Sequence, residues 1–226
     1  HLTMIFWKHV AESFEDLCRK GISEDQLLRD ITGHLYEYLE LGETDGTFKK
    51  YLPEEVYINP SIKPHFFTGS IIKEKNSENN FVILTPSCDI ANKKAKHILL
   101  ASVRSLTDDP VRGIKAKSLN EIPAELPDAD RQTREDDKKR SQEDLEKLIR
   151  NNYSDKYYFL PKSRNFDGGL INFQDLESVD PNTMNDRFDI VATVNNQFLK
   201  DIVARFSFYY SRQGAPEIDF SVDDLP

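Results

Sequence analysis

The sequence is poor in cysteine, in long apolar runs and in net positive charge, and each shortage excludes a class of protein. Its 226 residues include two cysteines, Cys18 and Cys88. Two cysteines predict neither a disulfide framework nor a zinc site, and they are typical of a reducing, cytoplasmic compartment. A formal net charge of −9 argues against a general nucleic-acid-binding protein, although it is compatible with a local basic groove.

The apolar residues are dispersed through the chain. No apolar run approaches the roughly 20 residues that a transmembrane helix needs, so no membrane contact is expected. The chain begins at His1 without a positively charged leader before an apolar segment. We therefore expect no signal peptide, and we expect the chain to start inside a longer polypeptide. With 38% hydrophobic and 31% charged residues, the composition indicates a globular protein that has one highly solvated part.

Two helices are predicted before residue 43. Apolar residues recur at helical spacing over residues 2–19, and Gly21 ends this first helix. Ser23 begins the second helix, where Gln26 stands three residues on, as in a capping box. The second helix ends at Gly42, and the glycines and prolines of residues 42–64 predict a connecting loop.

The centre of the chain is the segment Phe-Val-Ile-Leu-Thr-Pro-Ser-Cys-Asp-Ile-Ala at residues 81–91. Its four leading apolar residues predict a strand buried on both faces, which Pro86 ends because proline has no amide hydrogen. Ser87, Cys88 and Asp89 then follow at the mouth of this strand, and we expect the corner to point Cys88 and Asp89 into a shared groove. Strands are also predicted at residues 66–72, with a bend at Gly69, and at residues 97–103. Such an antiparallel meander tends to close into a small barrel.

The second half of the chain alternates between charge and sheet patterns. Thirteen of the twenty residues from Arg131 to Arg150 are charged, which predicts a solvated helix or excursion. An arm that binds a partner through Lys138, Lys139 and Arg140 is the alternative. Strands follow at residues 157–160, 170–173, 175–179 and 188–194. The strands at residues 170–173 and 175–179 are expected to pair after a turn at Gly168-Gly169. Asn195 then caps an apolar closing helix that Gly214 and Pro216 end.

Several short strings of this sequence resemble the PemK/MazF family of prokaryotic toxins. The resemblance covers about half the chain, residues 65–105 and 157–211, and its strings are Thr68-Gly69-Ser70-Ile71-Ile72, Val82-Ile83-Leu84-Thr85-Pro86, residues 98–103, Leu170-Ile171-Asn172 and Leu176-Glu177-Ser178-Val179-Asp180. It implies an SH3-like barrel of antiparallel strands with a terminal helix. Many members of that family cleave RNA without a metal, and the cleavage usually depends on a basic residue, often arginine. The resemblance therefore implies that this activity is possible here. The first loop, residues 73–80, contains no arginine, and Arg104 is the nearest replacement.

Together these patterns predict an α+β protein with an N-terminal helix pair, an antiparallel SH3-like β-barrel with a charged helical insertion, and a C-terminal helix. The helical N-terminal region is placed at residues 1–43. The PemK/MazF-like barrel and its closing helix are placed at residues 55–105 and 157–215. A charged insertion is placed at residues 106–152, and an acidic tail at residues 216–226.

The candidate catalytic residues are Cys88, Asp89 and Arg104. A nucleophilic Cys88 would need a nearby cation or imidazole, and Lys93, Lys94 and His97 are close in sequence. The structural alternative is that Cys88 is a small buried residue and Asp89 caps the next turn. For RNA cleavage, Asp89, Arg104 and Lys73 could supply the base, the acid and the charge stabilisation, with Arg187 and Arg205 as alternatives. No cofactor and no metal are expected.

Three functions are weighed for this chain. The first is a regulatory or interaction module of a bacterial signalling or phage-defence system, with a protein partner. The second is a metal-independent endoribonuclease of the toxin type, with RNA as its substrate, and the third is a cysteine-dependent enzyme. The aromatic side chains of the closing helix, Phe206, Phe208, Tyr209 and Tyr210, would favour an oligomer if they are exposed.

Overall fold

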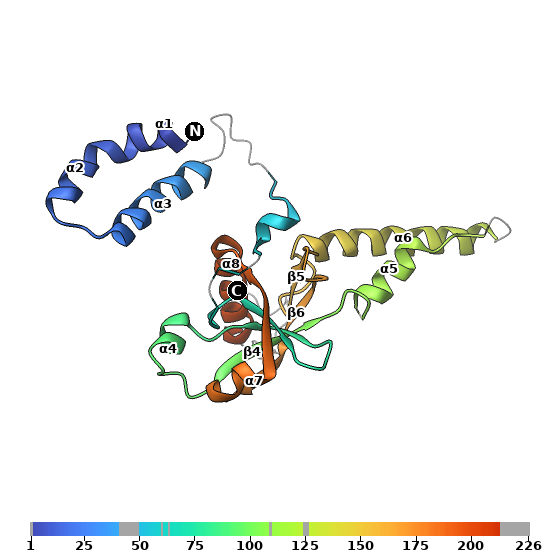
Figure 1. The fold of residues 1–226 in the computed structure, drawn as a ribbon. Helices are drawn as coiled ribbons and strands as arrows, with labels where there is room; N and C mark the ends of the chain where they lie inside the picture. Colours follow the sequence, from blue (N-terminus) through green and yellow to red (C-terminus); the bar gives the residue numbers. More distant parts are fainter. Residues whose placement is uncertain are drawn as a thin grey trace, which may run out of the picture. The chain divides into compact units, whose positions relative to one another are not determined.

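The computed structural model describes residues 2–40, 50–59, 61–62, 64–108, 110–123 and 127–212. The chain divides into two compact units, residues 1–51 and residues 52–226 (Figure 1). The predictions for Gly42, Gly214, Pro216 and the tail at residues 216–226 lie outside the described residues.

The first unit consists of helices, as predicted. It contains α1 (Leu2–Ile5), the π-helical turn η1 (Phe6–Val10), α2 (Ala11–Arg19) and α3 (Glu24–Glu40). Gly21 ends α2 in the left-handed region, at φ 67°, and its amide donates to the Cys18 carbonyl over 3.0 Å. The predicted capping box is present, because the Ser23 amide donates to Gln26 Oε1 (2.8 Å) and the Gln26 amide to Ser23 Oγ (3.3 Å). The π-helical turn within the first helix was not predicted.

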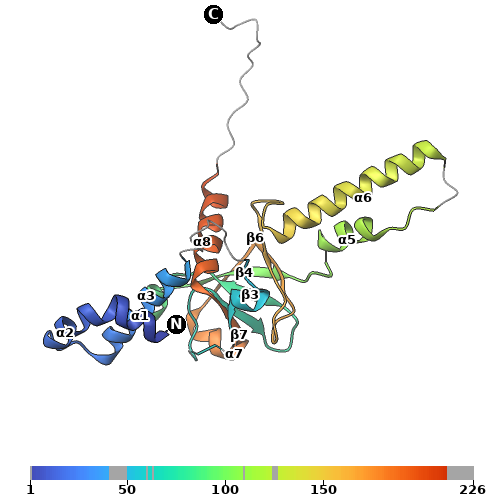
Figure 2. The same ribbon diagram turned by 90° about the horizontal axis from the view of Figure 1, so that it is seen from above.

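The second unit is built on a curled antiparallel sheet, and the α+β class is confirmed. Among the described residues the sheet has seven strands in the order β1-β7-β2-β3-β4-β6-β5. The strands are β1 (Tyr57–Ile58), β2 (Ser70–Glu74), β3 (Asn80–Ile83), β4 (Ile98–Arg104), β5 (Tyr157–Leu160), β6 (Gly169–Val179) and β7 (Phe188–Val194). Figure 2 shows the sheet curling into a half-barrel below the helix α8 (Asn196–Ser211).

Side chains bridge the two edge strands of this half-barrel. The Tyr57 hydroxyl on β1 donates to the Pro161 carbonyl just beyond β5, over 2.6 Å. The Tyr57 ring also meets the edge of Phe166, with ring centroids 5.8 Å apart. Burial raises the pKa of Tyr57, so its hydroxyl remains a protonated donor. The curl of the sheet is therefore held at its seam by side-chain contacts between β1 and the segment after β5.

Two apolar clusters cover the two faces of the sheet. Along residues 81–84, Val82 and Leu84 join the cluster that packs under α8, and Phe81 and Ile83 join the other. The strand is thus buried on both faces, as predicted. The second cluster contains Met184 of α7 (Met184–Arg187) and contacts Ile90 of α4 (Ser87–Ala91), so these two short helices cover it. The 3-10 turn η3 (Pro181–Thr183) directly precedes α7.

The charged insertion forms a helical hairpin that projects from the sheet, as Figures 1 and 2 show. Its helices are α5 (Val111–Leu119) and α6 (Asp128–Ile149), of which only the second was predicted. Val111 and Leu148 bury against Leu170 of β6 and anchor the hairpin at its base. Lys139 and Arg140 are exposed on α6. Their exposure is compatible with an arm that binds a partner, which stays a prediction.

Three further predictions need correction. Residues 53–58 are a short 3-10 helix, η2 (Pro53–Val56), followed by β1, where a loop was expected. Residues 169–179 form one strand, β6, whose register shifts at a bulge opposite Ala101 and Ser102. Asn195 precedes α8 as predicted, but its side-chain amide donates to the Glu55 carbonyl and makes no cap bond.

Candidate functional site

A buried threonine fixes the corner that follows β3. Thr85 Oγ1 accepts the Leu99 amide hydrogen over 2.6 Å, and the Thr85 carbonyl accepts the Thr68 hydroxyl over 2.8 Å. The first bond ties the corner to β4, and the second ties it to the segment that enters β2. Pro86 then occupies the N-cap position of α4. The polar residues after Pro86 are therefore attached to a rigid part of the sheet.

Ser87 belongs to the same hydrogen-bond network. Its Oγ accepts the Thr68 amide hydrogen over 3.0 Å and lies 2.8 Å from Thr68 Oγ1. Because the single hydroxyl hydrogen of Thr68 goes to the Thr85 carbonyl, Ser87 must be the donor in the bond between the two hydroxyls. Both the hydrogen and an acceptor site of Ser87 are thus used within the protein, which gives this hydroxyl a structural role.

The helix α4 separates its residues into two sets. Ser87, Ile90 and Ala91, at helical spacing, line a hollow in the surface. Cys88 and Asp89 do not belong to that lining. Cys88 is exposed rather than buried, and its thiol lies 3.8 Å from Asp89 Oδ1. The Asp89 backbone carbonyl accepts the amides of Lys94 and Ala95 and so closes the turn after α4.

Arg104 lies at the opposite end of β4 from this corner. Leu99, near the first residue of β4, bonds the corner, whereas Arg104 is the last residue of the strand. Six residue steps at about 3.3 Å each place the two ends roughly 20 Å apart. Arg104 pairs instead with Asp175, at 3.4 Å. The structure brings Cys88 and Asp89 together and leaves Arg104 apart from them.

The other basic residues considered for RNA cleavage have acidic partners. Lys73 Nζ lies 2.7 Å from Glu78 Oε2. Arg187 lies between Glu74 (2.9 Å) and Glu177 (3.0 Å). The hydrogen bond from Arg187 lowers the pKa of Glu74, and the same contact raises the pKa of Arg187. Arg205 pairs with Asp201 on α8, at 3.3 Å.

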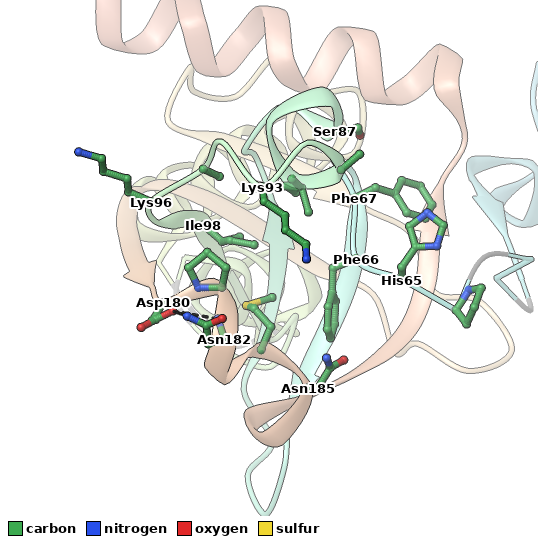
Figure 3. A pocket seen from close by; sticks show the side chains of 16 residues that line it. His65, Phe66, Phe67, Ser87, Lys93, Lys96, Ile98, Asp180, Asn182 and Asn185 are labelled. Carbon is green, nitrogen blue, oxygen red and sulfur yellow. Dashed lines mark hydrogen bonds between the residues drawn. The ribbon is translucent and has the colours of Figure 1, made fainter.

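The hollow beside α4 has a volume of ≈ 1140 Å³ and four walls (Figure 3). They are the segment 64–67 before β2, helix α4 with the loop after it, the first residue of β4, and the segment 180–185 of η3 and α7. Phe66, Ile90, Ile98 and Met184 form its apolar floor, which is one end of the second apolar cluster. The polar groups of its lining are Ser87, His65, Lys93, Lys96, Asp180, Asn182 and Asn185.

Lys93 holds an unusual backbone position in this hollow. It follows the C-cap of α4 at φ 53°, where its amide bonds the Ile90 carbonyl and the Lys94 amide bonds the Asp89 carbonyl. This is the Schellman arrangement, whose left-handed position usually holds glycine. Figure 3 shows the Lys93 side chain reaching into the hollow towards Phe66, whereas Lys96 points away from it at the rim.

The hollow gathers positive charge on an acidic chain. Two of the three lysines of residues 92–97, Lys93 and Lys96, line the hollow together with one carboxylate, Asp180, although the whole chain has a formal net charge of −9. Within the described ranges, no ion pair is formed by Lys93 or Lys96, in contrast to Lys73, Arg104 and Arg187. An anion that carries an apolar group would therefore meet complementary surfaces here.

Comparison with known proteins found no match, either among family models, among curated proteins or among solved structures. In the described part of the chain, no three histidine, cysteine or acidic side chains are grouped so that they could hold a metal ion. No helix in the described ranges is long and apolar enough to cross a membrane.

The hollow itself was not predicted from the sequence. Its lining comes from four segments that the fold brings together, and no local motif marks them. The signal that could have found it is the lysine-rich run at residues 92–97, which stands between a helix and a strand. Those lysines were weighed only as neighbours of the Cys88 thiol.

Proposed function

We propose that this chain is a non-catalytic regulatory interaction module and that the hollow beside α4 is its binding site for a protein partner. The observation that carries the proposal is a cation, Lys93, that forms no ion pair with the described residues and is held over an apolar floor by a hydrogen-bonded backbone turn. A rigid pocket with few polar groups over an apolar surface is the usual form of a binding site. The setting, a bacterial signalling or phage-defence system, rests on the resemblance to the toxin barrel, on the missing arginine in the loop at residues 73–80 and on the acidic balance of the chain.

The placement of the predicted catalytic residues supports a role in binding. Asp89 and Arg104 are separated by the length of β4, and Arg104 is paired with Asp175. A phosphoryl-transfer site needs its base, its acid and its charge-stabilising group around one reacting atom. Cys88 has a carboxylate, Asp89, as its neighbour, whereas thiol activation needs a cation or an imidazole.

The test is co-expression of the chain with the products of its neighbouring reading frames. We expect one of them to co-purify, and we expect Lys93→Gly to reduce the amount recovered. Lys94→Gly is the matched control, because Lys94 is the next residue along the chain and does not line the hollow. Equal recovery with both variants would contradict the proposal, as would the absence of any co-purifying product.

The alternative function is a metal-independent endoribonuclease. One observation favours it, since His65 and Lys93 line the same hollow, and an imidazole and an ammonium around one bound phosphate can serve acid–base chemistry. Purified protein should then cleave RNA in the presence of a chelator, and His65→Ala should abolish the cleavage. Cleavage that is lost on Asp89→Ala or Arg104→Ala would instead restore the catalytic trio predicted from the sequence and overturn the binding role.

A further inference from the structure

We propose that the hollow beside α4 binds a short acidic peptide segment that carries one large apolar side chain. This inference rests on the proposed function and names the chemistry of the partner. The hollow has two parts that differ in character, an apolar floor and a basic rim. Each part selects a different feature of the ligand.

The floor selects the apolar side chain. Phe66 and Ile90 are half-buried and present the accessible apolar surface, which rests on Ile98 and Met184, both almost fully buried in the second apolar cluster. A cavity of ≈ 1140 Å³ is larger than one aromatic side chain requires, and it leaves room for several residues of peptide backbone. Burial of one large apolar side chain is the main source of affinity in such a site.

The rim selects carboxylates over phosphates. Lys93 offers an ammonium group over the floor and Lys96 a second one at the rim. Among the described residues that line the hollow there is no arginine, the side chain whose planar fork fits a phosphate. Asp180 shares the rim and repels any anion placed beside it, so the ligand's carboxylates must be spread along a chain that reaches Lys93 and avoids Asp180. Asn182 donates its side-chain amide to Asp180 over 2.9 Å, and its carbonyl oxygen is an acceptor for a peptide amide.

The backbone at Lys93 indicates that its side chain has a use. Glycine at the left-handed position of a Schellman turn avoids the contact between Cβ and the carbonyl oxygen. A lysine at φ 53° holds the turn less favourably, yet it places an ammonium over the floor of the hollow. Strained positions of this kind are concentrated at functional sites.

The experiment is a titration of the ¹⁵N-labelled full chain with a model peptide, acetyl-Asp-Asp-Phe-Asp-Asp-amide, followed by NMR. We expect shifts of the amides of Phe66 and of residues 90–98, with saturation below about 5 mM. The affinity should fall as salt is raised, because exposed charges are screened within a few ångströms at high ionic strength. Two matched peptides, one with asparagine for aspartate and one with alanine for phenylalanine, should each bind at least about threefold more weakly.

Variants of the protein complete the test. Lys93→Gly should weaken binding of the model peptide about threefold to tenfold. Lys96→Ser should weaken it less, because the Lys96 side chain points away from the hollow, and Lys94→Gly should leave the affinity unchanged. Absence of shifts around the hollow at the same peptide concentration would overturn the inference. So would tighter binding of adenosine monophosphate than of the peptide at the same residues.

The two proposals can fail separately. If the peptide does not bind but recovery of a partner still depends on Lys93, the ligand class is wrong and the interaction role stands. If the purified chain cleaves RNA and His65→Ala abolishes the cleavage, the interaction role is wrong whatever the peptide does.

Discussion

Replacing Lys93 by glycine should make the protein more stable. Lys93 adopts φ 53° in the turn that ends α4, and this backbone conformation costs a residue with a Cβ atom about 1–2 kcal/mol. Glycine removes that cost, but it loses about 0.5–1 kcal/mol more backbone entropy on folding. The difference is a net gain of about 0.5–1 kcal/mol in the free energy of unfolding.

The assay is thermal and chemical unfolding of the full chain. For a protein of this length, the gain should raise Tm by about 1–4 °C. Lys94→Gly is the control, since Lys94 lies outside the left-handed region and should lose about 0.5–1 kcal/mol through backbone entropy alone. If Lys93→Gly were less stable than the wild type, the strain at this turn, and with it the argument for a functional lysine, would be refuted.

Three further predictions concern the stability of the fold. Thr85→Val should lower the free energy of unfolding by about 1–3 kcal/mol, because the Leu99 amide loses its acceptor. Thr85→Ser keeps the hydroxyl and should retain most of the stability. Urea unfolding measures both variants. Gly169→Ala should lower the free energy of unfolding by at least about 2 kcal/mol, because the new Cβ would lie 2.6 Å from the Arg104 carbonyl oxygen. Gly33→Ala is the control, since there is open space around Gly33 in α3, and it should raise the free energy of unfolding by about 0.5–1 kcal/mol. Thermal unfolding measures both variants. Glu74→Gln should destabilise the protein at pH 7, and the difference from the wild type should shrink as the pH is lowered. Since Arg187 lowers the pKa of Glu74, the stability from this carboxylate is complete above its ordinary pKa of about 4.3 and is lost as the pH falls through the lowered pKa of the folded state. A difference that stays constant as acid is added would contradict the contact.

Local patterns in the sequence were sufficient for much of the fold. The capping box at Ser23 and Gln26, the left-handed glycine at residue 21 and the strand at residues 188–194 each depend on neighbours in the chain, and all are present. The burial of Phe81–Leu84 on both faces followed from a continuous apolar run. These features need no knowledge of which distant segments meet.

The predictions that were wrong concern features that depend on contacts between segments far apart in the sequence. β1 forms because Tyr57 and Ile58 pair with Val194 and Thr193, more than a hundred residues away, and prolines around it favour a loop on local grounds. The hollow joins segments 64–67 and 180–185, which no periodicity links. Arg104 was grouped with Asp89 by its place at a strand end, but antiparallel pairing puts it at the wrong end of the sheet.

The account depends on the claim that the hollow beside α4 is a binding site and that Lys93 is kept for its ammonium group. The most direct test is the ratio of the dissociation constants of the model peptide for Lys93→Gly and Lys94→Gly, measured at one salt concentration on folded protein. We predict that the ratio is about three to ten, while Lys93→Gly is the more stable variant. A ratio of one would contradict the claim.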